Sequence, residues 1–364
     1  MRRGLSVSVD LDAAGHNLDV IRSHARSLPV IAVVKADAYG HGSVQLSNKF
    51  MEAGAGSLAV AFVSEARTLR EAGISAPLLV LFDRTDIPSY FDLSLTPVIH
   101  DLRTARTFDM EARKRGVLMD AHIKIDTGMG RMGFPDGDLG PVMEVLEQKN
   151  IRVTGLMTHF ADADLEDKEF SLGQIEKFRA TLGALEKRGL KKPLCHISNS
   201  AASLSLPEAA FDAVRPGLAL YGISPFSDRD YGLRPVMSVR APIVSLRRLS
   251  KGSTISYGRT YTATRDMTAA VIAAGYADGL SRAMSNRAEV IIKGKRAPIV
   301  GRICMDLSVA DVTHVEGLDE YGEALILGTD GGESITAWQL AAAADTIPYE
   351  ILLNMGRASL RSYS

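Results

Sequence analysis

The chain has 364 residues, of which 46% are hydrophobic and 23% are charged, and its net charge is -1. This length is sufficient for two domains, and the composition is that of a globular protein. The nearly neutral charge argues against nucleic acid or an anionic membrane surface as a partner.

The N-terminal stretch MRRGLSVSVDLDAAGHN carries two arginines, followed by alternating polar and apolar residues. A signal peptide needs a continuous apolar segment after its basic residues, so we expect residues 5–11 to form a strand. The sequence holds no stretch that is long and apolar enough to span a bilayer. Cys195 and Cys304 show neither a metal-binding nor a redox spacing. We therefore expect a cytoplasmic protein.

Apolar runs alternate with segments of helical periodicity from residue 30 to about residue 225. Several of the helical segments, among them 63–73, 101–116 and 170–189, end at glycine, the usual residue of a left-handed C-cap. Eight strand–helix units predict a (β/α)8 TIM-type barrel. A doubly wound open sheet is the alternative, and counting alone separates the two poorly. The eight apolar runs are 30–35, 57–62, 77–82, 95–100, 118–127, 153–160, 194–198 and 213–221.

The pattern of apolar and polar residues changes after about Asp230. Short alternating segments (241–249, 267–274, 289–292 and 307–312) are separated by glycine-rich turns, which predicts a second, mainly β domain with one helix at about 335–343. The N-terminal strand has no place in the barrel, so we expect it to join this second domain. The predicted domains are residues 1–10 (the N-terminal strand), 11–232 (the cofactor-binding barrel) and 233–364 (the mainly β domain).

Lys35 lies at the carboxyl end of the first apolar run, within the stretch VVKADAYGHG. Desolvation at a strand end lowers the pKa of a lysine and favours a neutral, nucleophilic amine. The Tyr39 ring and two glycines follow directly, and glycine lets the backbone approach a planar ligand. This combination suggests a Schiff base to a carbonyl cofactor. The alternative is a strand-terminal lysine whose head group simply reaches solvent.

Further reactive side chains fall at the ends of later strands, where barrels of this kind build their active sites. Lys124 and Arg131 end the fifth run, and His159 ends the sixth. Ser200 follows the seventh run, and Arg215 lies in the eighth. Each alone has a structural explanation as a surface ion pair, a hydrogen-bonded core histidine or a helix cap. Their occurrence at consecutive strand ends favours a site.

A phosphate site is expected after the seventh and eighth strands, where such barrels commonly bind this group. Ser200 can donate its hydroxyl there, and Gly217 and Leu218 offer backbone N–H groups. A phosphate opposite a Schiff-base lysine suggests pyridoxal phosphate, whereas the spacings of a Walker loop and of a dinucleotide fingerprint are absent.

Arg215 decides what such a cofactor can do, because a guanidinium donates hydrogen bonds and does not accept them. If it faces the pyridine nitrogen, that nitrogen stays unprotonated and the ring is a weaker electron sink. This arrangement disfavours transamination and suits racemisation, in which one carbon loses and regains a proton.

Racemisation needs an acid/base group on each face of the substrate. Lys35 can serve one face, and Tyr257, in the turn Ser256–Gly258, is the candidate for the other. The reference pKa of a phenol, about 10, is too high for a base near neutrality. A neighbouring cation such as Arg131 and the protonatable ring of His159 could lower it. The alternative for Tyr257 is a buried ring with a satisfied hydroxyl.

The stretch VVKADAYGHG resembles, nearly letter for letter, the cofactor-lysine signature of alanine racemase, and further motifs follow in family order along essentially the whole chain. The resemblance implies pyridoxal 5'-phosphate, with Lys35 as the base for the D enantiomer. It implies Tyr257 as the base for the L enantiomer, with His159 as its partner. Arg215 matches the partner of the pyridine nitrogen. Arg131 resembles the residue that reaches the phenolic oxygen of the cofactor and the substrate carboxylate.

The same resemblance assigns the remaining site residues. Lys124 matches a position that is often carbamylated, which would turn a cation into an anion that orients Arg131. The backbone N–H of Met305 would bind the substrate carboxylate, with Asp306 beside it and Asn199 next to the phosphate loop. No metal is expected. The cofactor contacts are Lys35, Tyr39, Ser200, Arg215, Gly217, Leu218 and Tyr349.

The family resembled is a head-to-tail homodimer in which the β domain of one subunit completes the active site of the other. Tyr257, Met305 and Asp306 would then act across the interface. The tail from residue 355 to residue 364 is less close to the family pattern.

The leading hypothesis is an isomerase that interconverts L- and D-alanine and supplies D-alanine for peptidoglycan. One alternative is a racemase of serine or of a broader set of small amino acids, because an apolar pocket rejects an added hydroxyl weakly. A non-catalytic pyridoxal-phosphate-binding protein would resemble the barrel alone. A metal hydrolase using His159, Asp162 and Asp164 is the remaining alternative.

Overall fold

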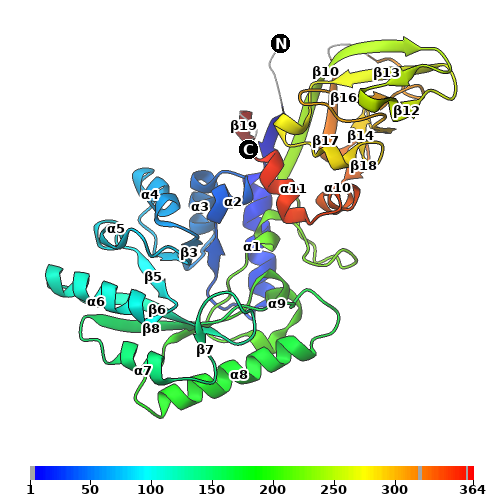
Figure 1. Ribbon diagram of the computed structural model, residues 1–364. Helices are drawn as coiled ribbons and strands as arrows, with labels where there is room; N and C mark the ends of the chain where they lie inside the picture. The colour runs from blue at the N-terminus through cyan, green and yellow to red at the C-terminus, as the bar shows by residue number, and fades with distance from the viewer. Residues whose placement is uncertain (1–4, 319–321, 358–359) are drawn as a thin grey trace. The chain divides into compact units, whose positions relative to one another are not determined.

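The computed structural model describes residues 5–318, 322–357 and 360–364 (Figure 1). The chain divides into two compact units. The first, here called the barrel unit, holds residues 14–38 and 43–233. The second, here called the β unit, holds the described residues up to 13 together with 39–42 and 234–364.

The barrel unit is built on parallel strands that neighbour one another in the order β2-β3-β4-β5-β6-β8-β9. The path closes on itself through the eighth run, because Val214 bridges Val30 and Ala213 bridges His196, both in parallel. An open doubly wound sheet would leave two edges unpaired, so the predicted TIM-type barrel is confirmed. The strands are β2 (Ile31–Val33), β3 (Ser57–Val60), β4 (Leu78–Val80), β5 (Thr96–Ile99), β6 (Met119–Asp126), β8 (Ile151–Met157) and β9 (Leu194–His196), with the short β7 (Phe134–Pro135) beside β6.

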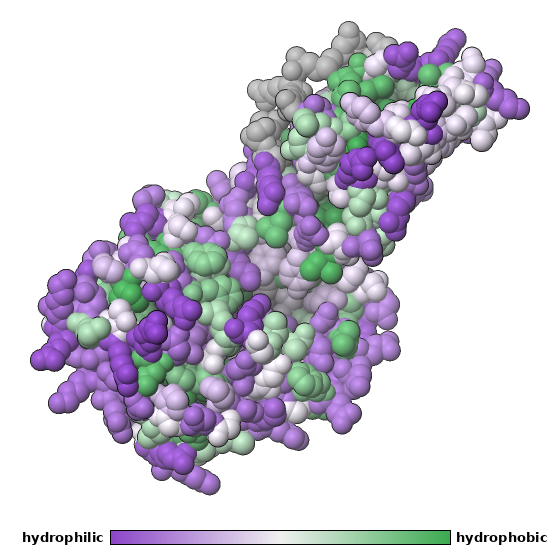
Figure 2. Space-filling view, in the orientation of Figure 1, coloured by the Kyte–Doolittle hydropathy of each residue, from purple (hydrophilic) through white to green (hydrophobic). Residues whose placement is uncertain are grey.

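Short apolar strands form here because helices cover the outer face of the barrel, so most strand residues are buried on both faces. Every residue of β2 and of β4 is buried. The charged faces of the helices point outward, and Figure 2 shows hydrophilic residues over most of the surface above α6, α7 and α8. The helices are α1 (Leu11–His24), which begins in the β unit, α3 (Ser43–Glu52), α4 (Val63–Glu71), α5 (Ile87–Asp92), α6 (Leu102–Arg115), α7 (Gly140–Leu146), α8 (Glu169–Glu186) and α9 (Ser200–Ser205).

Local sequence sets the ends of these helices. The Asp101 carboxylate accepts the N–H of Thr104 (2.8 Å) at the start of α6, and Gly116 ends that helix in the left-handed conformation with φ 68°. The predicted glycine cap is therefore confirmed at this helix.

The eighth apolar run differs from a full strand. In the described chain its bridges lie at Ala213 and Val214, and its hydrogen bonds to the neighbouring strands end at Pro216, whose oxygen accepts the N–H of Val33 at 3.0 Å. Leu218–Tyr221 form a 3-10 helix. Pro216 and Gly217 separate the two parts, and proline cannot donate a ladder hydrogen bond. The chain therefore leaves the barrel wall earlier than the run of apolar residues suggests.

The β unit contains a mainly antiparallel sheet in the order β15-β14-β17-β10-β1-β19. The N-terminal strand β1 (Ser6–Val9) pairs antiparallel with β10 and parallel with β19. The remaining strands are β10 (Met237–Leu249), β11 (Thr254–Ile255), β12 (Tyr261–Thr262), β13 (Met267–Ile272), β14 (Glu289–Ile292), β15 (Lys295–Pro298), β16 (Ser308–Asp311), β17 (Glu323–Asp330), β18 (Glu333–Ile335) and β19 (Leu360–Tyr363).

Two helices follow this sheet in the chain, where the sequence pattern predicts one. Thr336 caps α10 (Ala337–Ala344) by accepting the N–H of Gln339 at 3.1 Å. The second helix, α11 (Pro348–Met355), begins at a proline whose fixed φ suits the first helical position. It spans about two turns, too short for a clear helical period in the sequence.

Candidate active site

Lys35 opens a left-handed turn, α2 (Lys35–Tyr39), directly after strand β2. Residues 36–39 all have φ between 52° and 55°. This conformation costs an L residue about 1–2 kcal/mol. The Glu65 carboxylate accepts the N–H of Ala36 (2.6 Å) and that of Ala61 (2.7 Å). These contacts hold the strained turn against helix α4 and so fix the backbone that carries Lys35.

The Lys35 side chain is half-buried and lies among positive charges. Burial lowers its pKa, and the charges of Arg131 and Arg215 lower it further, while Glu65 acts in the opposite direction. The Phe82 ring centroid lies 5.4 Å from Lys35 Nζ and 5.5 Å from Arg131 Cζ. A lowered pKa gives the amine more of its neutral form, which is the nucleophilic and basic form.

Lys124, on strand β6, is 2% exposed. Burial lowers its pKa to about 8, helped by the charges of Arg131 and Arg215. Among the residues that the structure describes, no hydrogen bond or ion pair is made by its Nζ. Two residues later, Asp126 accepts the N–H groups of Gly128 (3.0 Å) and Gly130 (3.1 Å), which shapes the exposed loop that presents Arg131.

Arg215 is 4% exposed, and both terminal nitrogens of its guanidinium are fixed. Nη1 donates to the backbone oxygen (2.9 Å) and to Nδ1 (2.7 Å) of His196. Nη2 donates to the backbone oxygen of Thr158 (2.9 Å) and to Nδ1 of His159 (3.2 Å). The carboxyl ends of β8 and β9 thus hold this arginine in one orientation.

These contacts also set the protonation of His159. Because a guanidinium only donates, Nδ1 of His159 accepts, and the proton of the neutral ring is on Nε2. Burial and then the charge of Arg215 hold the pKa of His159 well below its ordinary value. Burial and the neighbouring cations therefore keep the His159 ring neutral.

Ser200 organises a set of backbone donors at the end of the barrel wall. Its Oγ accepts the N–H of Gly217 (2.9 Å) and that of Ala219 (3.2 Å), at the start of the 3-10 helix that contains Leu218. Asn199 caps α9 by accepting the N–H of Ala202 at 3.0 Å. One buried hydroxyl and several converging N–H groups are the donors that an anion such as phosphate requires.

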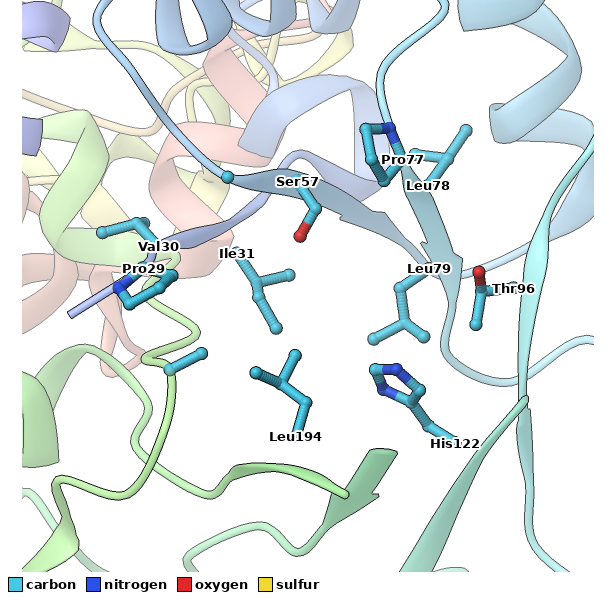
Figure 3. A pocket seen from close by; sticks show the side chains of 12 residues that line it. Pro29, Val30, Ile31, Ser57, Pro77, Leu78, Leu79, Thr96, His122 and Leu194 are labelled. Carbon is cyan, nitrogen blue, oxygen red and sulfur yellow. The ribbon is translucent and has the colours of Figure 1, made fainter. Parts of the chain in front are cut away.

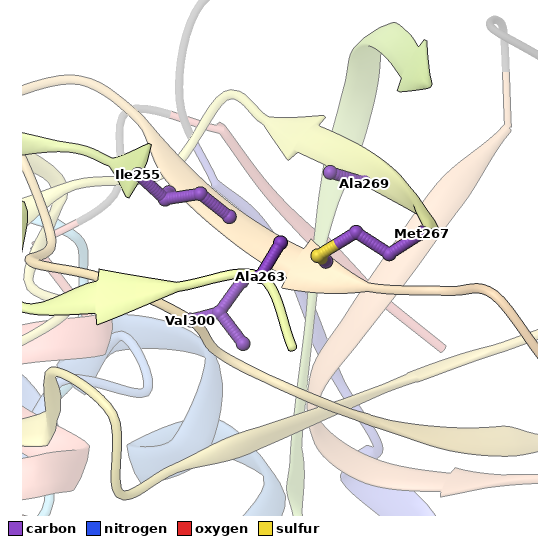
Figure 4. Close-up of a cluster of buried hydrophobic side chains, with 5 residues drawn as sticks. All are labelled: Ile255, Ala263, Met267, Ala269 and Val300. Atoms are coloured by element: carbon purple, nitrogen blue, oxygen red, sulfur yellow. The ribbon is translucent and has the colours of Figure 1, made fainter. Parts of the chain in front are cut away.

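Tyr257 lies at the tip of the hairpin formed by β11 and β12 in the β unit, and its side chain is 70% exposed. Its neighbours Ser256 (φ 61°) and Gly258 (φ 70°) have left-handed backbone, and the Ser256 hydroxyl donates to the backbone oxygen of Arg302. Ile255 in β11 and Ala263 after β12 belong to a hydrophobic cluster that anchors the hairpin (Figure 4). The cluster consists of Ile255, Ala263, Met267, Ala269 and Val300.

Met305 lies in a neighbouring loop of the β unit and is 53% exposed, with the half-buried Asp306 next to it. The backbone oxygen of Met305 accepts the N–H of Ala277 at 2.9 Å. A Cβ at Gly275 would lie 2.2 Å from this oxygen, so only glycine permits the close approach of the two segments.

Tyr39 and Tyr349 belong to the same unit and contact each other. Their ring centroids are 5.9 Å apart with an interplanar angle of 41°. Tyr39 is buried, whereas Tyr349, in the first turn of α11, is 38% exposed.

The structure therefore brings Lys35, Lys124, Arg131, His159 and Arg215 within electrostatic reach of one another in the barrel unit. Tyr39, Tyr257, Met305, Asp306 and Tyr349 lie in the β unit.

Sequence reasoning did not single out four residues that support the site. These are Glu65, Phe82, His122 and His196. Phe82 follows a barrel strand directly, so an aromatic residue at a strand end was an available signal. Glu65 lies on a helix among other charged residues, and the sequence gives no sign that it accepts backbone N–H groups.

The metal-hydrolase alternative finds no support in this geometry. In the described part of the chain, no three His, Cys, Asp or Glu side chains lie close enough to hold a metal ion. Asp162 instead accepts a hydrogen bond from the hydroxyl of Ser171, in α8, at 2.7 Å.

Within the described residues, every helix is too short or too polar to cross a membrane.

Comparison with known proteins assigns the chain to a family. The family model for the alanine racemase N-terminal domain matches residues 9–225, and the model for the C-terminal domain matches residues 236–363. An alanine racemase from Thermodesulfovibrio yellowstonii is 43% identical, over 100% of this chain and 98% of the relative. The crystal structure of alanine racemase from Streptomyces lavendulae superposes with a TM-score of 0.94 at 35% identity, covering 100% of this chain and 98% of the other.

A third similar protein shows a cofactor in place. The crystal structure of alanine racemase from Bartonella henselae contains covalently bound pyridoxal phosphate. It superposes with a TM-score of 0.90 at 25% identity, and the match covers 100% of both chains. From end to end, this chain belongs to the alanine racemase family.

Proposed function

We propose that Lys35 and Tyr257 are the two bases of an enzyme that interconverts L- and D-alanine with pyridoxal 5'-phosphate and supplies D-alanine for peptidoglycan. One observation carries this proposal more than any other. Arg215 is buried, and His196, His159 and the backbone of Thr158 fix its guanidinium, a group that only donates hydrogen bonds, in one orientation. A carboxylate in this place would favour a protonated ring nitrogen and a broader range of reactions.

The residues present fit the cofactor. A phosphate matches the donors gathered by Ser200, because the N–H groups of Gly217 and Ala219 already converge on one oxygen, Ser200 Oγ. Lys35 has the lowered pKa of a nucleophilic amine and would be the residue that holds an aldehyde cofactor. We infer that Lys35, Ser200, Arg215, Gly217 and Leu218 hold the cofactor.

We extend this inference to Tyr39 and Tyr349 as further contacts to the cofactor, largely around its phosphate. Bound pyridoxal 5'-phosphate supplies an electron sink for the charge left at the substrate α carbon.

Lys35 removes the α proton of D-alanine in this mechanism and returns one to form D-alanine in the reverse direction. Its lowered pKa, caused by burial and by neighbouring arginines, keeps part of the amine free of a proton and able to accept one.

Tyr257 acts on the opposite face and belongs to the partner subunit of a homodimer. Its exposed fraction of 70% within one chain leaves the phenol without the enclosed environment that a base needs, and docking on a partner would supply it. Because His159 is neutral with its proton on Nε2, it would partner the phenol by donating a hydrogen bond and not by its charge.

Arg131 and the backbone N–H of Met305 bind the substrate carboxylate, with Asp306 beside them. We infer that carbamylation of Lys124 orients Arg131. The neutral Lys124 amine adds to the carbon of CO2 and releases one proton, which leaves an anionic carbamate on Nζ. Its pKa of about 8 supports this reaction, because a large part of the amine is neutral at mildly basic pH.

Serine is the second substrate to be tested. The exposed side chains of Tyr257 and Tyr349 offer aromatic rings that would close a small pocket. Such a pocket rejects an added hydroxyl only weakly, so a lower rate of serine racemisation is expected.

The decisive experiment measures solvent deuterium uptake at the α carbon separately for the two enantiomers. Lys35→Ala abolishes racemisation. Tyr257→Phe lowers racemisation by about 10²- to 10⁴-fold, the usual contribution of a general base. This variant still exchanges the α proton of D-alanine through Lys35 but loses exchange with L-alanine. Equal exchange of both enantiomers in Tyr257→Phe would refute the two-base assignment, and a cofactor-loaded wild type without racemisation would refute the function itself.

A further inference from the structure

Two buried histidines behind Arg215 extend its hydrogen bonds across the barrel. Nε2 of His196 lies 2.8 Å from Nδ1 of His122, and Nδ1 of His196 lies 2.7 Å from Nη1 of Arg215. His196 is fully buried, and His122 is 9% exposed. The chain of contacts runs from β9 to β6, between strands that are not neighbours in the barrel wall.

The direction of every hydrogen bond in this chain is fixed by chemistry. Arg215 can only donate, so Nδ1 of His196 accepts. A neutral His196 then carries its proton on Nε2 and donates it to Nδ1 of His122. His122 must accept at Nδ1 and therefore carries its own proton on Nε2. Burial and the charge of Arg215 hold the pKa values of both rings below the ordinary value, which keeps both neutral.

The series of hydrogen bonds ends, at His122, in a cavity. A cavity of about 260 Å³ is lined mainly by apolar residues of the strands, and the His122 ring reaches into it between Leu79 and Leu194 (Figure 3). The cavity places the Nε2–H of His122 where solvent can accept its hydrogen bond. The series of hydrogen bonds therefore ends without a buried unsatisfied donor. Strand β8 makes room for this ring with Gly155, since a Cβ there would lie 2.4 Å from the ring.

We propose that His122 is a positioning residue for Arg215: it accepts from His196 and thereby selects the tautomer whose Nδ1 holds the guanidinium. Without an acceptor at position 122, the Nε2–H of His196 is left buried and unsatisfied, at a cost similar to a lost hydrogen bond. The alternative tautomer would point an N–H of His196 at a guanidinium that can only donate. Either outcome loosens Arg215, which contacts the cofactor under the proposed function on which this inference rests.

Two substitutions of His122 separate the loss of the hydrogen-bond acceptor from the loss of the imidazole ring. Asparagine places its Oδ1 near the position of Nδ1 and can still accept, whereas leucine fills a similar space without an acceptor. We expect His122→Leu to lower the kcat for alanine racemisation about tenfold, with little change in KM, and to shift the visible absorption of the bound cofactor. His122→Asn should retain most of the wild-type kcat and most of the wild-type absorption of the cofactor. Thr96→Val, which alters the same cavity outside the chain of hydrogen bonds, is the matched control and should leave both unchanged.

A direct measurement does not depend on turnover. In holoenzyme with ¹⁵N-labelled histidine, the ring nitrogens of His122 and His196 should both show the neutral form with the proton on Nε2. A proton on Nδ1 of His196 would overturn the proposal, as would equal losses in the leucine and asparagine variants or no loss in either. If His122→Leu does not fold, the tautomer pattern of the wild type decides alone. A wild type that shows this pattern but does not racemise alanine would refute the proposed function and not the tautomers.

Discussion

At the scale of single residues, the site depends on the mutual repulsion of its cations. Arg131 and Arg215 lie close enough to Lys35 and Lys124 to lower the affinity of both lysines for protons, in addition to the effect of burial. Arginine does not give up its proton, so the pKa values of the two lysines are the ones that fall. The sequence indicates that basic residues gather at the strand ends. The structure adds that burial, and then these neighbouring charges, lower the pKa values of the two lysines and of His159.

Lys124 shows this effect as a pH-dependent stability. Its pKa is about 8 in the folded chain and 10.5 as the reference, so burial of its charge destabilises the fold below pH 8. As the pH rises from 8 to 10.5, the unfolded chain retains protons that the folded chain has lost, and the penalty disappears. Lys124→Met should therefore raise the free energy of unfolding by up to about 3 kcal/mol below pH 8, and the gain should shrink toward pH 10.5.

Urea unfolding of the two proteins in CO2-free buffer across this pH range tests the effect. Lys187→Met, at the exposed end of α8, is the control and should show no such trend. A stability difference that stays constant with pH would contradict the expected titration of Lys124.

At the scale of elements, the left-handed turn after β2 depends on one side chain. The Glu65 carboxylate accepts N–H groups from both the turn (Ala36) and the start of α4 (Ala61 and Phe62). Glu65→Gln replaces one of its two accepting oxygens with an amide that donates. We expect a loss of about 1–3 kcal/mol in the free energy of unfolding, together with a lower kcat because Lys35 is less well placed. Glu71→Gln, an exposed position on the same helix, is the matched control for thermal unfolding and turnover. Equal effects of both substitutions would remove the special role of Glu65.

A pair of glycines tests the packing of β8 against the His122 ring. A Cβ added to Gly155 would lie 2.4 Å from that ring, whereas a Cβ added to Gly183 in α8 would meet no atom within 4 Å. Gly155→Ala should lower the free energy of unfolding by about 1–3 kcal/mol, the usual cost of overpacking. Gly183→Ala should raise it by about 0.5–1 kcal/mol, because alanine favours the helix. Calorimetric melting temperatures distinguish the two cases, and an unaffected Gly155→Ala would show that the ring can move aside.

Sequence patterns predicted these elements unevenly. Continuous apolar runs located the barrel strands, because burial on both faces leaves a plain signal in the sequence. The turn after Lys35 could not be predicted, since positive φ at residues 36–39 arises from tertiary contacts and contradicts local preference. Helix α11 was missed, and Leu218–Tyr221 was placed in a strand. The roles of the site residues remain predictions, although the positions of Lys35, Lys124, His159 and Arg215 at strand ends match what the runs implied.

At the scale of the whole molecule, a single chain leaves the β-unit site residues Tyr257 and Met305 exposed. Tyr257, Met305 and Leu307 have exposed fractions of 70%, 53% and 39%, and we propose that these large exposed side chains of one unit belong to a surface that binds a partner. In a homodimer with two-fold symmetry, the same surface of each subunit would complete the other's site. Separation of the subunits by dilution should then abolish turnover.

Mixing two inactive variants tests this arrangement more sharply than dilution does. If Lys35 of one subunit works with Tyr257 of its partner, a hybrid of Lys35→Ala and Tyr257→Phe subunits has one site carrying both substitutions and one site carrying neither. Random reassociation makes half of the dimers hybrids, so mixing should restore about a quarter of wild-type racemisation. If both bases came from one chain, every site in the hybrid would carry one substitution and mixing would restore nothing. Each variant taken through the same dissociation and reassociation alone supplies the baseline, and a wild-type sample treated in the same way measures losses in the procedure. A mixture that stays at the baseline while the wild type recovers would place Lys35 and Tyr257 in the same subunit.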